Sequence, residues 1–344
     1  MTNLTTISRT ARALSISGMI ALSGFLLNGC DSGTPSASST EETAPERIKI
    51  VATTGMIADM ARSIGGDLVE VTTLVGVGVD PHLYKPTRDD VARLLSADLV
   101  LYNGLHLEGQ MEDVLERAGA DRPTVAVTAE LPKALLIEPG DGEEHEDPHV
   151  WLSPEYWGLC GVSVRQALSD LAPEHNLVFN TNFQDWFDTA EELRAYGAAA
   201  IGSIPSDSRL LITSHDAFGY FGRAFDLEVM AIQGISTESE AGLADLEEMV
   251  ALVVERRIPT VFIESSVPRR SIEALIEGAA ARGQEVTIGG ELYSDSMGPA
   301  GSDTGTWRGM IIHDITTITT ALGGTLPESA PTPPGTDAME ETDE

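Results

Sequence analysis

Basic residues, cysteines and long apolar runs are scarce in this sequence. It has 21 lysines and arginines against 54 aspartates and glutamates, and its formal net charge is −33. Because a surface of this sign repels a polyanion, we exclude nucleic acid as a partner. The two cysteines exclude a disulfide-rich scaffold. One of them, Cys160, stands among apolar residues and is predicted to pack as a small hydrophobe.

The apolar run 13–27 is too short for an ordinary membrane span. It follows two arginines and ends in Leu27-Asn28-Gly29-Cys30, which resembles the lipobox of bacterial lipoproteins. We therefore expect residues 1–30 to be a lipoprotein signal peptide and Cys30 to carry the lipid. The mature chain is then anchored in the cell membrane on its extracytoplasmic side, in a periplasm or on the outer face. An ordinary secretory signal and a stray anchor are the alternative interpretations.

Two polar, proline-containing segments cannot bury a core. Residues 31–46 (DSGTPSASSTEETAPE) are predicted to be a flexible tether, and residues 326–344 a disordered acidic tail. The chain between these two segments is long enough for two domains of medium size.

Short β-branched runs alternate with helical stretches on both sides of one long helical pattern. Such βαβ organisation predicts mainly parallel sheets flanked by helices. We expect an α/β fold of two lobes, residues 47–173 and 205–325, joined by one long rigid helix at 174–204. Apolar residues at three- and four-residue spacing mark this helix: Phe179, Phe183, Trp186, Phe187, Ala190, Leu193 and Tyr196. The alternative is a core helix within a single domain.

Four strands are predicted in each half of the folded chain. They cover 48–53, 69–75, 99–102, 124–127, 210–213, 227–232, 260–263 and 285–288. Helices are predicted at 56–64, 88–96 after a capping threonine, 110–118, 154–171, 243–256, 271–282 and 306–321. The segment 236–240 (STESE) is interpreted as the capped start of the helix at 243–256.

The triplet Asp-Pro-His occurs at 80–82 and again at 147–149, although the chain has only seven histidines. Proline fixes its own φ and biases the residue before it toward extended backbone, so each triplet presents its histidine from a stiff loop. A carboxylate stands two positions before each histidine, and a metal-binding imidazole needs such an acceptor nearby. Either triplet alone is typical of a turn. The two together, with two residues of the second half, favour metal ligands.

Two further candidate ligands, His215 and Asp295, stand beside or shortly after predicted strand ends. Ligands of α/β sheets bind outside the carboxyl ends of strands, so four residues are expected to converge in the cleft between the lobes: His82, His149, His215 and Asp295. Three imidazoles and a carboxylate suit Zn²⁺, and a bidentate carboxylate raises the coordination number and admits Mn²⁺ or Fe²⁺. Four protein ligands leave no open position for a reacting water, which favours transport over catalysis.

Six stretches of the chain form a specific combination. They are 80–87 (DPHLYKPT), 103–108 (NGLHLE), 147–154 (DPHVWLSP), 214–221 (SHDAFGYF), 233–241 (QGISTESEA) and 289–298 (GGELYSDSMG). With them, the chain resembles the zinc- and manganese-binding lipoproteins that serve ABC transporters as substrate-binding proteins (the cluster A-I solute-binding proteins). The resemblance covers nearly all of the chain that is expected to fold.

The resemblance implies two lobes with the metal between them, and it implies the ligand role for the same four residues. Members of this family that have histidine at the position of His215 include zinc receptors and some receptors that take manganese. The stretch around Asp295 is most similar to the branch credited with both metals. Many zinc members have a histidine-rich loop where this chain has 141–147 (DGEEHED), which is interpreted as a surface loop.

We therefore expect the extracytoplasmic substrate-binding component of a divalent-metal ABC importer, which binds one Zn²⁺ or Mn²⁺, with Fe²⁺ as a further candidate. The expected partners are the permease with its ATPase, and the membrane through the lipid on Cys30. The chain is expected to be a monomer and not an enzyme. It has no Walker A sequence and no His-Glu-x-x-His, so we exclude the transporter's ATPase and a zincin protease. Two alternatives stay open: a secreted metal-dependent hydrolase and a surface adhesin lipoprotein.

Overall fold

The computed structural model describes residues 47–139 and 145–331. The expected signal peptide with Cys30, the tether 31–46, part of the acidic run 141–147 and the tail from 332 onward lie outside the described residues. Within the described part, no helix combines the length and the apolar character that a bilayer span needs.

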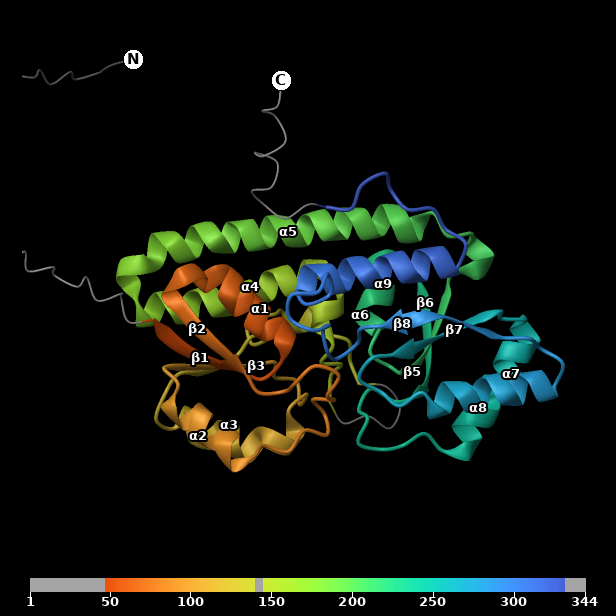
Figure 1. Cartoon of the computed structure of the whole chain (residues 1–344), viewed down its shortest axis with the longest axis horizontal. Helices are drawn as coiled ribbons and strands as arrows, with labels where there is room; N and C mark the ends of the chain where they lie inside the picture. Colours follow the sequence, from red (N-terminus) through yellow and green to blue (C-terminus); the bar gives the residue numbers. More distant parts are fainter. Residues whose placement is uncertain (1–46, 140–144, 332–344) are drawn as a thin grey trace, which may run out of the picture. The chain divides into compact units, whose positions relative to one another are not determined.

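The first lobe is built on one parallel sheet in the strand order β2-β1-β3-β4 (Figure 1). Its strands are β1 (Ile48–Ala52), β2 (Val69–Thr73), β3 (Leu99–Tyr102) and β4 (Thr124–Ala126). Its helices are α1 (Gly55–Gly65), α2 (Arg88–Ser96), α3 (Glu112–Gly119) and α4 (Pro154–Leu171). The register pairs Ile50 with Val71 on one side and with Leu99 on the other. These bounds confirm the strands and helices predicted for this half to within a few residues.

Alternation along the central strands explains the layers of the first lobe. Ile50 of β1 and Leu99 of β3 pack with α1 and α4 on one face. Val51 and Val100, one position further along each strand, pack with α2 and α3 on the other face. Because helices cover both faces, the buried positions of these strands are apolar on both faces, as in other parallel sheets.

The second lobe contains two parallel sheets of two strands each. They pair β5 (Leu210–His215) with β6 (Glu228–Gln233), and β7 (Thr260–Glu264) with β8 (Thr287–Leu292). Strands β5 and β7 lie side by side, and at their ends the Glu264 carboxylate accepts the backbone N–H groups of Ser214 and His215. The helices are α6 (Gly219–Phe225), α7 (Leu243–Arg256), α8 (Arg270–Ala281) and α9 (Trp307–Ala321). The short helix α6 was not predicted.

Helix capping was predicted correctly in one place and wrongly in another. Thr87 caps α2 in a capping box with Asp90, as expected. The segment 236–240 does not cap α7, because that helix begins after Gly242, whose N–H donates to Asp245. The Thr237 hydroxyl instead donates to Asp80 of the first lobe. It therefore makes a tertiary contact and does not cap the helix.

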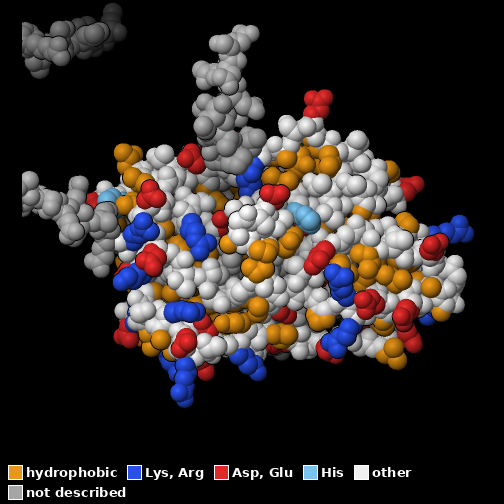
Figure 2. Space-filling model, in the orientation of Figure 1, with side chains coloured by type: hydrophobic (Ala, Val, Ile, Leu, Met, Phe, Trp, Pro, Cys, Tyr) orange, Lys and Arg blue, Asp and Glu red, His pale blue; other side chains and the backbone are white. Residues whose placement is uncertain are grey.

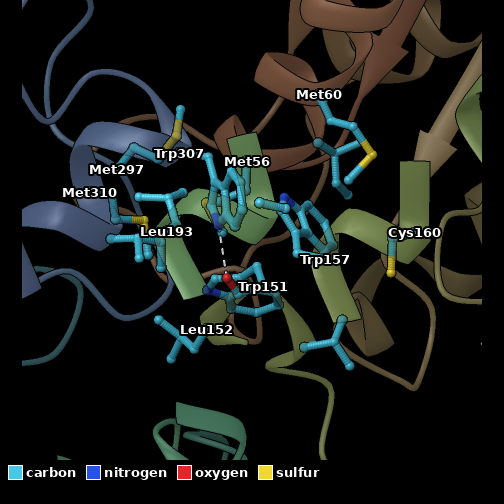
Figure 3. Packing of buried hydrophobic residues seen from close by; sticks show 14 of the residues in the cluster. Met56, Met60, Trp151, Leu152, Trp157, Cys160, Leu193, Met297, Trp307 and Met310 are labelled. Atoms are coloured by element: carbon cyan, nitrogen blue, oxygen red, sulfur yellow. Dashed lines mark hydrogen bonds between the residues drawn. The ribbon is translucent and has the colours of Figure 1, made fainter. Parts of the chain in front are cut away.

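The long helix is confirmed as α5 (Asn176–Gly202), which packs against α1 and α4 of the first lobe and α6 and α9 of the second. It belongs to a hydrophobic cluster that continues through both lobes. Figure 3 shows part of this cluster, in which the Trp307 indole N–H donates to the Trp151 carbonyl at 2.8 Å. Cys160 is buried in the same cluster, as predicted, and burial raises the pKa of its thiol. The lobes therefore share a core in addition to the helix that connects them.

Candidate metal centre

The structure brings the four predicted ligands together. His82 lies in the loop between β2 and α2, His149 directly precedes a 3-10 turn that leads into α4, His215 ends β5, and Asp295 follows β8. One nitrogen or oxygen atom from each residue lies within 4.8 Å of the others. All four are buried, with at most 4% of any residue exposed. Two ligands come from each lobe, so the group depends on the packing of one lobe against the other.

The donor atoms face a common centre. The Nε2 atoms of His82 and His149 are 3.3 Å apart. The two carboxylate oxygens of Asp295 face different rings: Oδ1 lies 3.3 Å from Nε2 of His149, and Oδ2 lies 3.3 Å from Nε2 of His215. His215 Nε2 and Asp295 Oδ1 are buried without a hydrogen-bond partner among the described residues. Buried polar atoms are costly when unpaired, so this arrangement fits a cation that all of them bind.

The two Asp-Pro-His triplets hold their histidines in different ways. Asp147 Oδ1 lies 2.7 Å from Nδ1 of His149 and accepts the backbone N–H of the same residue, which turns Nε2 toward the centre. The expected carboxylate contact to the ring is therefore present in this triplet. Asp80 accepts only the backbone N–H of His82 and uses its other oxygen for the Thr237 hydroxyl. It positions the loop and does not contact the His82 ring.

Glu264 is a functional residue that the sequence analysis missed. Its Oε2 lies 2.5 Å from Nδ1 of His215, and its Oε1 accepts two backbone N–H groups at the end of β5. A usable signal was present: the run Val-Phe-Ile-Glu ends a buried strand in a carboxylate. A carboxylate is rarely buried without a charged or hydrogen-bonding partner.

The loop that carries His149 is held by residues of the 103–108 stretch. Asn103 donates from its side chain to the Pro148 carbonyl at 3.0 Å. Glu108 accepts the Thr53 hydroxyl and the Asn103 backbone N–H, and burial raises the pKa of this carboxyl. The stretch therefore supports the loop before α4, although none of its residues reaches the centre.

Trp151 connects the two lobes at the centre itself. Its ring packs edge-on against His149 with the centroids 5.2 Å apart. Its indole N–H donates to the Ser294 carbonyl at 2.7 Å, directly before Asp295 in the chain. One side chain of the first lobe therefore positions a ligand from each lobe.

Burial and neighbouring carboxylates shift the pKa values of the three histidines in opposite directions. Burial lowers the pKa of His82 to about 3. Burial also disfavours the charged form of His149, but Asp147 and Asp295 outweigh it and raise the pKa to about 9. Burial disfavours the charged form of His215 as well, yet Glu264 and Asp295 hold its pKa well above the ordinary value. A metal ion needs unprotonated rings and therefore competes with protons at two of its ligands.

The other histidines lie away from the centre. His106 contacts Glu112 at 2.8 Å and stacks on His145 of the acidic run, with the ring centroids 3.9 Å apart. His175 stands at the start of α5, and His313 of α9 is 2.9 Å from the Glu291 carbonyl. The three histidines predicted as ligands therefore lie together, and the other four histidines lie elsewhere.

Comparison with known proteins gives one consistent result. Residues 50–321 match the model of the ZnuA family, described as zinc-uptake complex component A, periplasmic. The chain is 46% identical over 298 residues to the manganese-binding lipoprotein MntA of Bacillus subtilis, covering 87% of this chain and 95% of that protein. It is 26% identical over 309 residues to the manganese ABC transporter substrate-binding lipoprotein PsaA of Streptococcus pneumoniae, covering 88% and 97%. The solved structure of the periplasmic zinc-binding protein TroA from Treponema pallidum superimposes with a TM-score of 0.78 at 42% identity, covering 80% of this chain and 99% of that chain.

Proposed function

Since this chain belongs to the ZnuA family of substrate-binding proteins, we propose that it binds one Zn²⁺ or Mn²⁺ and delivers the ion to the permease of an ABC importer. The metal is the transported substrate and not a resident cofactor. One observation carries the proposal: four buried side chains from two lobes direct their donor atoms at one centre. The proposed ligands are Nε2 of His82, His149 and His215, with the carboxylate of Asp295.

The donor set supports either metal. Zn²⁺ favours four nitrogen, sulfur or oxygen donors in a tetrahedron, which three imidazoles and one carboxylate oxygen supply. The Asp295 oxygens each lie 3.3 Å from a different ring, so both can bind one ion and raise the donor number to five. A larger number of oxygen donors suits Mn²⁺ and Fe²⁺. The relatives are named for both metals: MntA is called manganese-binding and TroA zinc-binding.

The closed centre supports transport over catalysis. Its four donor residues are buried, and none of them is more than 4% exposed to solvent. A hydrolytic metal site keeps a position for water, which this arrangement does not offer. The family consists of solute-binding proteins of ABC importers and not of enzymes, so the hydrolase alternative has no support. No feature of the described residues favours the adhesin alternative.

The proposal extends to partners and location. MntA and PsaA are named lipoproteins, and we propose that Cys30 carries the lipid that anchors this chain at the extracytoplasmic side of the membrane. One acyl chain anchors only marginally, so stable attachment needs more than one. On the face in Figure 2, acidic and basic side chains are interspersed. We further propose that the protein acts as a monomer, next to the permease and its ATPase.

Release of the ion is proposed to need local movement and not a wide opening of the lobes. The core shared by the lobes and the long α5 both resist a hinge motion. The proposed lobes, 47–173 and 205–325 with the connection at 174–204, then keep their packing. His215 is the last residue of β5 and Asp295 lies in the loop after β8, and we propose that the segments that hold these two residues move.

Metal content tests the proposed function. The purified full chain is stripped with a chelator, offered Zn²⁺ and Mn²⁺ together, and analysed by elemental mass spectrometry. We expect one equivalent of metal, lost in His215→Ala and in Asp295→Ala and retained in His175→Ala, whose ring lies outside the centre. A folded protein without stoichiometric metal, or equal binding by all four proteins, contradicts the proposal.

A further inference from the structure

The second lobe is hydrogen-bonded to the loop that carries His82. The Thr237 hydroxyl donates to Asp80 Oδ2 at 2.6 Å, and the Ser296 hydroxyl accepts the Gly78 backbone N–H at 2.7 Å. We call residues 76–83 the His82 loop. Neither contact involves a proposed metal ligand, yet each lies within two residues of one. The position of His82 therefore depends on the second lobe.

The same loop exposes apolar side chains. Val77, Val79 and Leu83 are 58%, 39% and 50% exposed, and they account for three of the ten large apolar residues that are exposed in the described chain. Single exposed apolar residues need no explanation, whereas a cluster on one loop indicates a contact surface.

A groove lies between the His82 loop and the second lobe, and Leu83 is the exposed apolar residue of the loop that lines it. It has a volume of about 600 Å³, and its lining includes Asp80 and Leu83 from the loop and Leu243, Leu246 and Val267 from the second lobe. Leu243 is 73% exposed at the first position of α7. The groove thus offers apolar side chains from both lobes next to the metal centre.

Acidic groups exceed basic ones along the groove. Asp80, Glu238 and Glu240 line it, and the single basic side chain, Arg270, is 3.3 Å from Glu240 and pairs with it. An occupant that combines a large apolar side chain with a lysine or arginine therefore matches the groove in both shape and charge.

We propose that this groove is the docking surface for an extracytoplasmic segment of the importer's permease, which inserts an apolar side chain flanked by a basic one. Docking separates Thr237 from Asp80 and frees the His82 loop, so that contact with the recipient and release of the ion are coupled. The inference rests on the proposed function, because it requires delivery of metal to a permease. The His82 loop is then closed when Thr237 binds Asp80 and open when the two are apart. The permease segment opens the loop only to the extent that it binds the open form more tightly than the closed form.

Two features favour the permease over a second copy of this chain. The groove borders the metal centre, since Asp80 both lines it and accepts the N–H of His82. Opening the His82 loop beside the metal centre serves the permease, which receives the ion, and does not serve a second copy of this chain. A second copy also carries a net charge of −33 and is repelled by an acidic groove.

Crosslinking identifies the occupant. A photoreactive phenylalanine replaces Leu243 in the full chain, in cells that contain its importer, and Leu177 on α5 is the matched control with 80% exposure. We expect light to join position 243, and not position 177, to the permease. A product with a second copy of the chain, no product, or equal products from both positions overturns the inference.

Transport separates this inference from the proposed function. We expect Leu243→Asp to reduce metal uptake by cells about tenfold or more, as loss of a central interface contact does, and Leu177→Asp to leave it unchanged. Both purified variants are expected to bind one equivalent of metal. If they bind metal and transport it equally, the docking surface is refuted while the proposed function stands. If the unaltered chain binds no metal, the proposed function itself has failed.

Discussion

Glu264 Oε2 lies 2.5 Å from Nδ1 of His215, and neither side chain is exposed to solvent. The carboxylate fixes the ring with Nε2 toward Asp295, because its other oxygen is held by backbone N–H groups of β5. A carboxylate behind a ligating imidazole also makes the ring a stronger donor. We therefore expect Glu264 to contribute to metal affinity although it is not one of the four proposed ligands.

Glu264→Gln is expected to weaken metal binding by about 10- to 100-fold, because the amide keeps the shape and loses the charge. Glu291→Gln on β8 is the control, since that side chain is 46% exposed and pairs with the exposed Arg269. Titration of each purified protein against a chelator of known affinity measures the effect. Equal affinities for the two variants argue against a role for Glu264.

Metal binding is expected to strengthen as the pH rises. Despite burial, Asp147 and Asp295 raise the pKa of His149 to about 9, so below that pH the ion must displace a proton. In the metal-free protein the protonated ring stabilises the fold. That contribution is complete below the unfolded pKa of about 6.5 and is lost as the pH rises through about 9.

The gain in melting temperature on metal addition is therefore expected to grow as the pH rises from about 6 to about 9. Calorimetric scans with and without metal at several pH values measure it. An affinity that does not change between pH 7 and pH 5 is incompatible with three histidine ligands.

Thr237→Val is expected to speed metal release. The substitution keeps the shape and removes the hydroxyl that donates to Asp80 at 2.6 Å. A hydrogen bond to a charged group is worth about 1.5–3 kcal/mol, so the dissociation rate is expected to rise about tenfold or more. Stopped-flow mixing of the loaded protein with excess chelator gives the rate. Thr237→Ser retains the hydroxyl and is expected to behave like the unaltered chain, and a similar acceleration in both variants contradicts this role.

Trp307→Phe is expected to destabilise the protein by about 1–3 kcal/mol more than Trp186→Phe. Both indoles are buried in the shared core with their centroids 4.9 Å apart. Only Trp307 donates from its ring nitrogen, to the Trp151 carbonyl, whereas the Trp186 nitrogen has no hydrogen-bond partner among the described residues. Urea unfolding of the two variants tests the difference. Equal losses assign the stability to packing alone.

The overall dimensions are expected to stay the same when metal binds, because α5 and the shared core join the lobes. Small-angle X-ray scattering of the stripped and loaded protein measures the radius of gyration. A large change on loading shows a hinge motion and refutes release through local loop movement.

Much of the fold could be predicted because the apolar pattern follows the elements directly. The apolar run Leu-Val-Leu-Tyr after Asp98 indicates β3, and the periodic apolar and aromatic residues of α5 indicate a long helix. Helix α6 was missed because its seven residues are too few to establish a periodicity. The division of the second lobe into two sheets depends on pairing between distant strands, which one sequence does not reveal.

The convergence of the four candidate ligands was predictable from the sequence, and the residues that support them were less so. Identical triplets at 80–82 and 147–149 predict identical surroundings, but only Asp147 contacts the ring of its histidine. Asp147 uses Oδ1 for both the backbone N–H and the ring of His149, whereas the second oxygen of Asp80 accepts the hydroxyl of Thr237, a residue 157 positions away that the triplet does not indicate. Glu264 was missed for the same reason, since its partner His215 lies on another strand.

Anomalous diffraction from crystals of the loaded protein tests the central claim most directly. Data collected at the zinc and manganese absorption edges locate the ion without reference to the fold. We expect one peak, about 2.0–2.2 Å from Nε2 of His82, His149 and His215 and from the carboxylate of Asp295. A peak held by other residues, or no peak between the lobes in crystals that contain stoichiometric metal, contradicts the account.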